Sequence, residues 1–218
     1  MIHLHHVPMA RSLRVMWMLE ELGLDYDLSL YSIRDGSMRT PEFLRLSPAG
    51  RTPVLEMGDE VIFESGAILQ LLAERHPQSG LHRAPDHPDR ARYLELIHYS
   101  ETIGCLVENL NMNRVFLRNP ADASPVVIRL LTARLRGALA AVGPQLRGDF
   151  LLDSGFSAAD IMLAYGFVLA DRYVRVGDYP ELQAYWDRCK ARPAYQRAAA
   201  RDGVQDFFDR DFYPLPEV

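Results

Sequence analysis

The sequence predicts two folded units in one chain, a small α/β domain followed by an all-helical domain. Residues 1–78 alternate short apolar strands with amphipathic helices, whereas residues 89–218 show helical periodicity without a strand signal of comparable strength. Between them, residues 79–88 belong to a stretch rich in Pro, Gly, His and Asp, which is typical of an exposed connection. We therefore expect domains at 1–78 and 89–218, joined by a linker at 79–88.

The first unit begins with a strand, a helix and a second strand. Residues 2–7 read as a short strand, and residues 12–22 carry apolar side chains at helical spacing before Gly23, a typical C-terminal stop. Residues 26–31 alternate as a second strand. Because a helix crosses over between them, the two strands should run parallel.

A short helix, a hairpin and a closing helix complete this unit. The Thr-Pro pair that opens residues 40–46 predicts an N-cap followed by proline in the first helical turn. Two apolar strands flank the Gly58–Asp59 pair, a hairpin signal. A last helix should cover residues 65–74, before a proline.

The second unit reads as successive helices. A long one should run over 89–117, a second from a Ser-Pro start over 124–146, and two shorter ones over 179–193 and 193–201. Between them, the stretch FSAAD carries the strongest local signal of this half.

That stretch predicts a capped helix that continues to Tyr173. Ser157 should be the N-cap, with Asp160 at the third helical position in place of the usual Glu or Gln. Phe156 is placed to pack onto Ile161 as a hydrophobic staple.

Composition describes an ordinary globular protein. Of 218 residues, 48% are hydrophobic and 24% charged, and the formal net charge is -5. Basic residues interleaved with acids disfavour a nucleic-acid partner. No apolar run reaches the roughly 20 residues of a membrane helix, and the first residues lack the order of a secretory signal. We expect a cytoplasmic protein with no membrane partner.

Metal and dithiol chemistry have little support in the sequence. Cys105 and Cys189 are far apart and form no C-x-x-C motif. His3 and His5 share a face of the first strand, but His6 lies on the other face and no acid or cysteine follows nearby. We therefore predict no metal site.

The residues with chemical meaning begin at the hairpin. Pro53 offers no N–H to a sheet, and a cis bond before it would turn the backbone of Thr52 outward. Thr52 would then offer its N–H and C=O to an extended peptide, as another strand does. A strand-edge proline without a role is the plain alternative.

Glu64 and Ser65 mark a second binding position. They stand where a strand ends and a helix begins, and there free N–H groups and the helix dipole favour an anion. Ser65 alone would be an ordinary N-cap, but Glu64 adds a partner for an ammonium group. The pair suits an amino-acid terminus, so the hairpin and the helix start together indicate a short peptide ligand.

Four stretches carry a family resemblance. RSLRVMWMLEELGLDYD, TPEFLRLSPAGRTPVLE, FESGAILQLLAERHP and GFSAADIMLAY occur in this order, and together they resemble the cytosolic glutathione transferases over nearly the whole chain. The resemblance implies a thioredoxin-like first domain (βαβαββα, mixed sheet) that binds glutathione as co-substrate, and a helical second-substrate domain. It also implies a homodimer and the transfer of alkyl or aryl groups to glutathione, in detoxification or in a catabolic step.

The same resemblance implies roles for individual residues. Thr52 and cis-Pro53 would hold the cysteinyl backbone of glutathione, and Glu64 with Ser65 the γ-glutamyl end. Arg51 would meet the glycyl carboxylate. Positions on the long helix would line the second-substrate pocket, unless they are only core and surface: Asn109, Met112, Asn113 and Phe116.

The chemistry requires a thiolate, because a thiol with a pKa near ~8.5 is only a few per cent ionised at neutral pH. Lowering that pKa by about 2 units contributes roughly 2.7 kcal/mol. The loop HVPMARSLR contains neither Tyr nor Cys, so Ser12 is its only hydroxyl and the catalytic candidate of a bacterial-like serine-type member. It lies later than the family serine, whose place is nearer residues 8–10. If Ser12 only caps the helix, Arg11 or a backbone N–H would stabilise the thiolate.

Other outcomes remain open at this stage. The lack of a cysteine in the loop disfavours thiol exchange, and the lack of a serine- and cysteine-rich loop disfavours a maleylacetoacetate isomerase. Ether cleavage and peroxide reduction would keep the same first site. Ala10 in the catalytic loop favours a binding or regulatory protein without turnover, whereas Thr52, Glu64 and Ser65 oppose it, because such a protein needs no peptide-binding set. The aromatic tail of residues 206–218 packs on the helical domain or covers the pocket.

Overall fold

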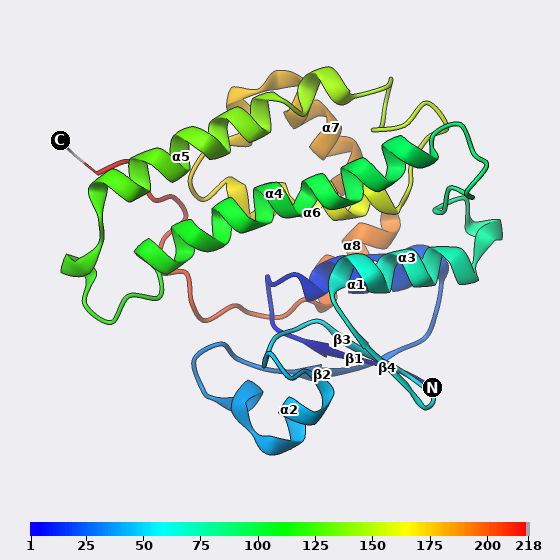
Figure 1. Cartoon of the computed structure of the whole chain (residues 1–218), viewed down its shortest axis with the longest axis horizontal. Helices are drawn as coiled ribbons and strands as arrows, with labels where there is room; N and C mark the ends of the chain where they lie inside the picture. The colour runs from blue at the N-terminus through cyan, green and yellow to red at the C-terminus, as the bar shows by residue number, and fades with distance from the viewer. Residues whose placement is uncertain (217–218) are drawn as a thin grey trace.

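The structure is a computed structural model that describes residues 1–216 (Figure 1). The first part of the chain has the order strand, helix, strand, helix, hairpin, helix. The elements are β1 (Ile2–His6), α1 (Ser12–Leu22), β2 (Asp27–Leu30), the 3-10 turn η1 (Ser37–Arg39), α2 (Pro41–Leu46), β3 (Val54–Met57), β4 (Glu60–Phe63) and α3 (Ser65–Arg75). The predicted thioredoxin-like βαβαββα order is confirmed.

These strands form one mixed sheet in the order β2-β1-β3-β4. β1 is parallel to β2 and antiparallel to β3, and β3 pairs with β4 as the predicted hairpin. Figure 1 shows α1 and α3 together on one face of the sheet and α2 on the other. The face with α1 and α3 is the one that turns toward the helical part of the chain.

The rest of the described chain is helical. Its elements are the turn η2 (Pro77–Ser79), α4 (Arg90–Arg114), η3 (Pro120–Asp122), α5 (Pro125–Ala140), η4 (Gly143–Gln145), α6 (Ala158–Ala170), η5 (Val176–Asp178), α7 (Pro180–Lys190) and α8 (Pro193–Arg201). Three predicted helix ends were wrong. α4 stops at Arg114, three residues before the predicted end at 117. α5 stops at Ala140 because a separate 3-10 turn starts at Gly143, and α6 stops at Ala170, after which Tyr173 closes a turn onto the Ala170 carbonyl.

Local capping explains where several helices begin. The side chain of Thr40 accepts from the N–H of Phe43 at the start of α2, and Ser124 accepts from Val127 at the start of α5. Both caps precede a proline in the first turn. At the other end of a helix, Gly23 closes α1 with φ 64°, in the left-handed region that glycine adopts easily.

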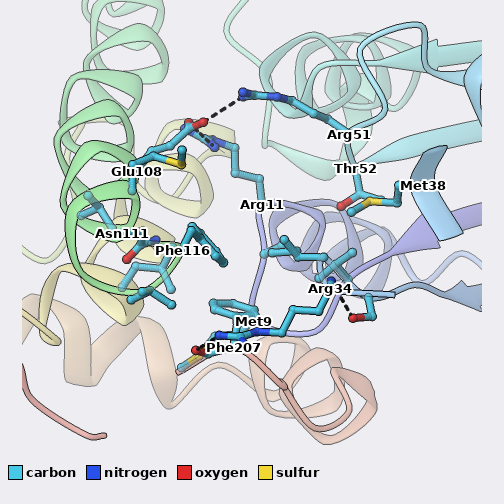
Figure 2. Close-up of a pocket in the computed structure, with 18 of the residues that line it drawn as sticks. Met9, Arg11, Arg34, Met38, Arg51, Thr52, Glu108, Asn111, Phe116 and Phe207 are labelled. Carbon is cyan, nitrogen blue, oxygen red and sulfur yellow. Dashed lines mark hydrogen bonds and ion pairs between the residues drawn. The ribbon is translucent and has the colours of Figure 1, made fainter. Parts of the chain in front are cut away.

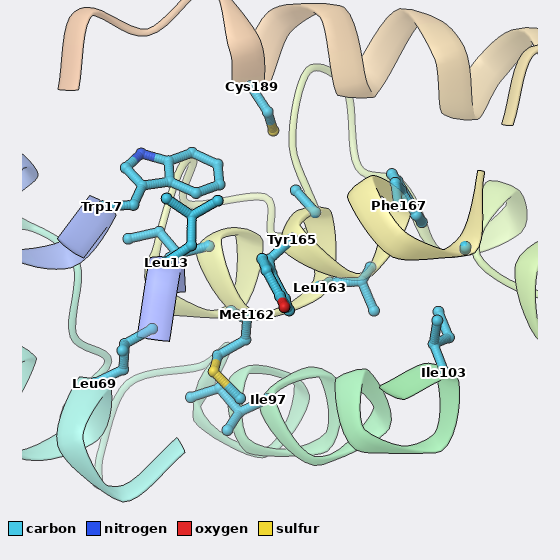
Figure 3. Packing of buried hydrophobic residues seen from close by; sticks show 14 of the residues in the cluster. Leu13, Trp17, Leu69, Ile97, Ile103, Met162, Leu163, Tyr165, Phe167 and Cys189 are labelled. Atoms are coloured by element: carbon cyan, nitrogen blue, oxygen red, sulfur yellow. The ribbon is translucent and has the colours of Figure 1, made fainter. Parts of the chain in front are cut away.

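α6 packs mainly against α4, and it also contacts α1 and α3 of the sheet domain and the helix α7 (Figure 3). The predicted capping box of Ser157 and Asp160 is present. Phe156 packs against the rings of Trp17 and Phe150. Its predicted staple onto Ile161 stays a prediction.

The two parts share one hydrophobic core, so the walls of any cleft between them are fixed relative to each other. Trp17 of α1 packs edge-on against Tyr195 of α8, with ring centroids 4.9 Å apart. Beside it, Arg192 binds Glu21 through two nitrogens, at 2.6 and 2.7 Å. Within residues 1–216, no helix is both long enough and apolar enough to span a membrane.

The C-terminal segment folds back onto the helical part. Phe207, Phe208 and Tyr213 are buried, and Phe212 lies under the guanidinium of Arg175. Residues 217–218 of the predicted aromatic tail lie outside the described residues.

Candidate functional site

A cavity of about 890 Å³ lies between the two parts of the chain (Figure 2). One wall comes from the β1–α1 loop, the segment after β2 and the segment before β3. The other comes from α4, from Tyr165 and its neighbours on α6, and from Phe207. Each wall therefore belongs to a different predicted domain.

The hairpin presents a free backbone edge to this cavity. The Thr52–Pro53 bond is cis, and Thr52 lines the cavity whereas Pro53 does not. The β3–β4 register pairs Val54 with Phe63, so Pro53 and Glu64 are the next residues outward on neighbouring strands. The sheet thus brings the two predicted halves of the glutathione site side by side.

Glu64 adopts an unusual backbone conformation at the start of α3. It has φ 75°, in the left-handed region that side-chain-bearing residues seldom adopt. Within residues 1–216, its carboxylate pairs with no cation, and the backbone N–H groups of Ser65 and Gly66 donate to no acceptor. Such a helix start with free donors can receive an anion. Neither Glu64 nor Ser65 lines the 890 Å³ cavity itself.

Ser65 is the first helical residue and not the N-cap, a position that Glu64 occupies. Its side chain is buried and accepts a hydrogen bond of 3.1 Å from Nη1 of Arg14. The same Arg14 nitrogen is bound to Oε1 of Glu101 on α4. Arg14 therefore links the start of α3 to the helical wall.

Arg14 is fully buried, yet it is incompletely paired. Among residues 1–216, its Nε and Nη2 atoms have no hydrogen-bond partner, and its guanidinium lies 4.8 Å from the centroid of the Tyr165 ring. Burial lowers the pKa of Arg14, against the influence of Glu101. Burial alone would raise the pKa of Glu101. The positive charges of Arg14 and Arg11 outweigh burial and hold the pKa of Glu101 below its ordinary value.

Ser12 is buried beneath the cavity and does not line it. Its Oγ lies 2.7 Å from Nδ1 of His6 and accepts from the N–H of Val7 at 3.2 Å. Nε2 of His6 in turn contacts Asp202, at 2.9 Å from its carbonyl and 3.2 Å from its carboxylate. This chain of contacts ties the end of β1 to α1 and to the segment after α8.

The β1–α1 loop is held from the helical side. Met9 has φ 62°; its N–H donates to the carboxylate of Asp202, and its carbonyl accepts from the hydroxyl of Tyr165 at 2.9 Å. The next residue, Ala10, lines the cavity where a hydroxyl would be expected. Within residues 1–216, the backbone N–H groups of Arg11 and Ser12, at the start of α1, donate to no acceptor.

Two arginines meet one carboxylate across the cavity. Arg11 contacts Glu108 at 3.1 Å and Glu101 at 3.2 Å, and Arg51 contacts Glu108 at 3.0 Å (Figure 2). Arg51 is exposed and, together with Arg39, sits beside Thr52 in the lining. Glu108 thereby connects α4 to both segments of the opposite wall.

The α4 wall uses a helix face different from the expected one. Met112 and Phe116 line the cavity. Asn109 and Asn113 do not, since their side chains donate to carbonyls one turn back on α4. Asn111, which sequence reasoning missed, lines it and accepts from Tyr173. The spacing of cavity-lining positions (Gly104, Val107, Glu108, Asn111, Met112 and Val115) fits one helical face, but the sequence does not say which face meets the other wall.

Other cavity or loop residues also carried no signal in the sequence. Tyr165 and Asp202 become significant only through their contacts with Met9. Arg34, Arg39 and Arg118 come from two connecting segments with no recognisable motif.

One group of side chains has the composition of a metal site. Atoms of His3, His5 and Glu56 that could bind a metal lie within 4.8 Å of one another, because Glu56 of β3 pairs with His3 in the sheet. His5 already contacts Glu56 at 2.8 Å and Tyr31 at 2.9 Å, and His3 contacts Ser29 at 2.8 Å. These contacts make a hydrogen-bonded patch on the sheet, to which we assign no metal.

Several characterised proteins are similar to this chain in sequence and in architecture. Residues 1–74 match the model of the family "Glutathione S-transferase, N-terminal domain". Glutathione S-transferase 4 of Zea mays is 31% identical, over 85% of this chain and 86% of that protein. A maleylacetoacetate isomerase of Pseudomonas aeruginosa is 32% identical, over 86% of this chain and 90% of that protein.

A solved structure is also similar to this chain in fold. A glutathione transferase of Burkholderia graminis, with two glutathione molecules bound per subunit, is 26% identical. It superposes with a TM-score of 0.80, covering 91% of this chain and 87% of that one. The family model, the relatives and the solved structure therefore agree, and the chain belongs to the glutathione S-transferase family.

Proposed function

We propose that the protein is a glutathione transferase that joins the sulfur of glutathione to small, largely apolar electrophiles. The observation that carries this proposal is a set of unused donors around the sheet end of the cleft. They are the Thr52 backbone edge and the N–H groups that begin α1 and α3. A peptide with two carboxylates and a thiolate would occupy all three.

In this proposal each part of glutathione has its own partners. The cysteinyl backbone pairs with Thr52 beside Pro53, as an added strand does. The γ-glutamyl carboxylate binds at the start of α3, with Ser65, and its ammonium group binds Glu64. The glycyl carboxylate binds Arg51.

The thiolate lies at the start of α1. The free N–H groups of Arg11 and Ser12 and the positive end of the helix dipole favour a negative sulfur there. The Arg11 guanidinium, shared between Glu101 and Glu108, adds positive charge on the same side. The Ser12 hydroxyl, occupied by His6 and Val7, fixes the loop and is not the donor.

The reaction needs no protein nucleophile. The thiol loses its proton to solvent, the sulfur forms a bond to an electrophilic carbon, and a leaving group departs with its electrons or a proton adds to the neighbouring atom. Within residues 1–216 no cysteine lines the cavity, and burial raises the pKa of Cys189 above its ordinary value. Thiol exchange through a protein sulfur therefore has no support in this cavity. We expect a cytoplasmic homodimer, as the family resemblance implies.

Calorimetric titration with glutathione, followed by steady-state conjugation of 1-chloro-2,4-dinitrobenzene, tests the proposal. Wild type should bind glutathione and release chloride. Replacing Glu64 and Ser65 together by alanine should weaken binding by about 100-fold, since two charged contacts are lost. Glu95→Ala, on the exposed face of α4, serves as the control. Binding that is unchanged in the double variant would remove this site, and binding without conjugation would leave a glutathione-binding protein.

A further inference from the structure

The cavity carries a charge opposite to that of the whole protein. The chain has a formal net charge of -5, yet six arginines line the cavity, and within residues 1–216 Glu108 is the sole carboxylate of its lining. A concave site lined with one sign of charge concentrates ligands of the other sign.

Protein carboxylates neutralise only half of these arginines. Arg11 and Arg14 are paired with Glu101, and Arg51 with Glu108. In contrast, Arg34, Arg39 and Arg118 pair with no carboxylate anywhere in residues 1–216.

Arg39 belongs to the glutathione end. Its Nη1 donates to the carbonyl of Ala49, and its guanidinium packs directly over Gly50, the second residue before Thr52. It therefore lies beside Arg51 and can share the glycyl carboxylate with it. Glutathione accounts for Arg39 and leaves Arg34 and Arg118.

Arg34 reaches toward the other end of the cleft. Figure 2 shows its side chain extending from the segment after β2 toward Phe207. Within residues 1–216, only the Nη2 atom of its guanidinium is engaged, in a hydrogen bond of 3.2 Å to the carbonyl of Phe207. The remaining donors of this planar group keep the geometry that suits a carboxylate.

An apolar surface surrounds this end of the cavity. The ring centroids of Phe116 and Phe207 lie 5.9 Å apart, and Ile33 and Leu117, the chain neighbours of Arg34 and Phe116, also line the cavity. Arg118 follows Leu117 in the segment after α4 and also lines the cavity. The combination of ring-lined surface and two unpaired guanidiniums fits a ligand with an apolar body and an anionic group.

We propose that the preferred second substrate is an electrophile with an apolar, aromatic body and a carboxylate, which Arg34 and Arg118 bind. This inference rests on the proposed transferase function. It adds a substrate class, since a purely apolar electrophile would leave both guanidiniums without a partner.

Two related chloronitrobenzenes test the inference. 1-Chloro-2,4-dinitrobenzene is neutral, and 4-chloro-3,5-dinitrobenzoate carries a carboxylate on the same kind of ring. In both, the glutathione sulfur bonds to the ring carbon that bears chlorine, and chloride leaves with the bonding electrons. For each compound, kcat/KM is divided by the rate constant of its uncatalysed reaction with glutathione, which removes the difference in intrinsic reactivity.

We expect wild type to favour the benzoate by about 10-fold at low ionic strength, with the preference shrinking as salt is added. Arg34→Gln and Arg118→Gln should each lower kcat/KM for the benzoate by about 5-fold or more and leave that for the neutral compound within about twofold. Arg45→Gln is the matched control, because Arg45 is an exposed arginine of α2 that does not line the cavity.

The outcomes separate the inference from the function on which it rests. Conjugation of the neutral compound with no preference for the benzoate, or with a preference that survives both substitutions, would overturn the inference and leave the transferase standing. If glutathione binds but neither compound reacts, or if glutathione does not bind, the proposed function fails and the inference falls with it.

Discussion

Two buried charged residues, Asp160 and Arg14, differ in how fully their polar atoms are hydrogen-bonded. Each carboxylate oxygen of Asp160 accepts two hydrogen bonds. Oδ1 accepts from the N–H of Leu151 and the hydroxyl of Tyr185. Oδ2 accepts from the N–H and the hydroxyl of Ser157. Arg14 is equally buried, but two of its nitrogens have no hydrogen-bond partner in the part of the chain that the structure describes.

The difference separates a structural cluster from a site. Buried polar groups are normally fully hydrogen-bonded, so an incomplete group beside a cavity marks a place where a ligand or a reaction can supply the remaining contacts. Asp160 stands in the centre of the helical core, whereas Arg14 lines the cleft. Removal of Asp160 should therefore affect folding, and removal of Arg14 should affect binding.

The largest effect is expected for Asp160→Ala. The change leaves the donors of Leu151, Ser157 and Tyr185 without their acceptor inside the core, and it removes a capping box, so the free energy of unfolding should fall by about 3 kcal/mol. Urea unfolding followed by circular dichroism measures it. A loss below about 0.5 kcal/mol would show that the cluster does not hold the core together.

Arg14→Met should give the reverse pattern. The substitution removes only one partner of the Arg14–Glu101 pair, but the Glu101 carboxylate is partly exposed and keeps its contact with Arg11, so it is not left as an unpaired buried charge. The free energy of unfolding should therefore change by only about 1 kcal/mol. Glutathione affinity should fall by about 10-fold or more, because Ser65 loses its donor and the start of α3 loses its link to Glu101. Calorimetry on the variant decides this. Unchanged affinity with a large loss of stability would make Arg14 a structural residue like Asp160.

A pH series tests the Asp160 cluster in another way. Burial raises the pKa of Asp160 to about 6, against the hydrogen bonds it accepts. The folded protein thus takes up this proton at a higher pH than the unfolded chain. Protonation of Asp160 therefore adds to the free energy of unfolding as pH falls through about 6, and this contribution is lost as pH rises through that value. Between about pH 7 and about pH 5, the free energy of unfolding should change by roughly 1 kcal/mol from this group.

Asp160→Asn supplies the reference for that series. Burial also lowers the pKa of His82, which makes folding less favourable as pH falls and opposes the effect of Asp160. The difference between wild type and Asp160→Asn cancels such contributions. Parallel stability curves for the two proteins from pH 7 to pH 5 would contradict the raised pKa.

The smallest effect is expected for Tyr165→Phe. The hydroxyl holds the carbonyl of Met9 and thereby the loop that carries Ala10 and Arg11. Its loss should lower kcat/KM by about 3- to 10-fold, the range of one neutral hydrogen bond. A decrease of about 100-fold or more, confined to kcat, would instead identify the Tyr165 hydroxyl as the group that stabilises the thiolate.

The features that the sequence predicts best are those determined by a few residues that are neighbours in the chain. The caps at Thr40, Ser124 and Ser157, the hairpin turn and the parallel β1–β2 pair all follow from local patterns and are confirmed. The cis bond before Pro53, expected from the family resemblance, is also present.

Features that depend on packing between distant elements were not predictable in the same way. Ser12 is two residues from Ala10, yet it points into the core and meets His6, because α1 begins at Ser12 and turns that side chain away from the cavity. The face of α4 that lines the cleft is set by α6 and by the sheet domain, so Asn109 and Asn113 fall outside it. Neither fact has a local signal.

The central claim is that the start of α1 and Arg11 stabilise the thiolate without help from a side-chain hydroxyl. The ultraviolet absorbance of bound glutathione thiolate, followed across pH in wild type, Arg11→Gln and Ser12→Ala, tests it most directly. Binding to wild type should lower the pKa of the glutathione thiol by about 2 units. In Arg11→Gln the pKa of the bound thiol should be about 1 unit higher than in wild type, and in Ser12→Ala it should equal the wild-type value. A thiol pKa that returns to its value in water in Ser12→Ala, with Arg11→Gln unchanged, would contradict the claim.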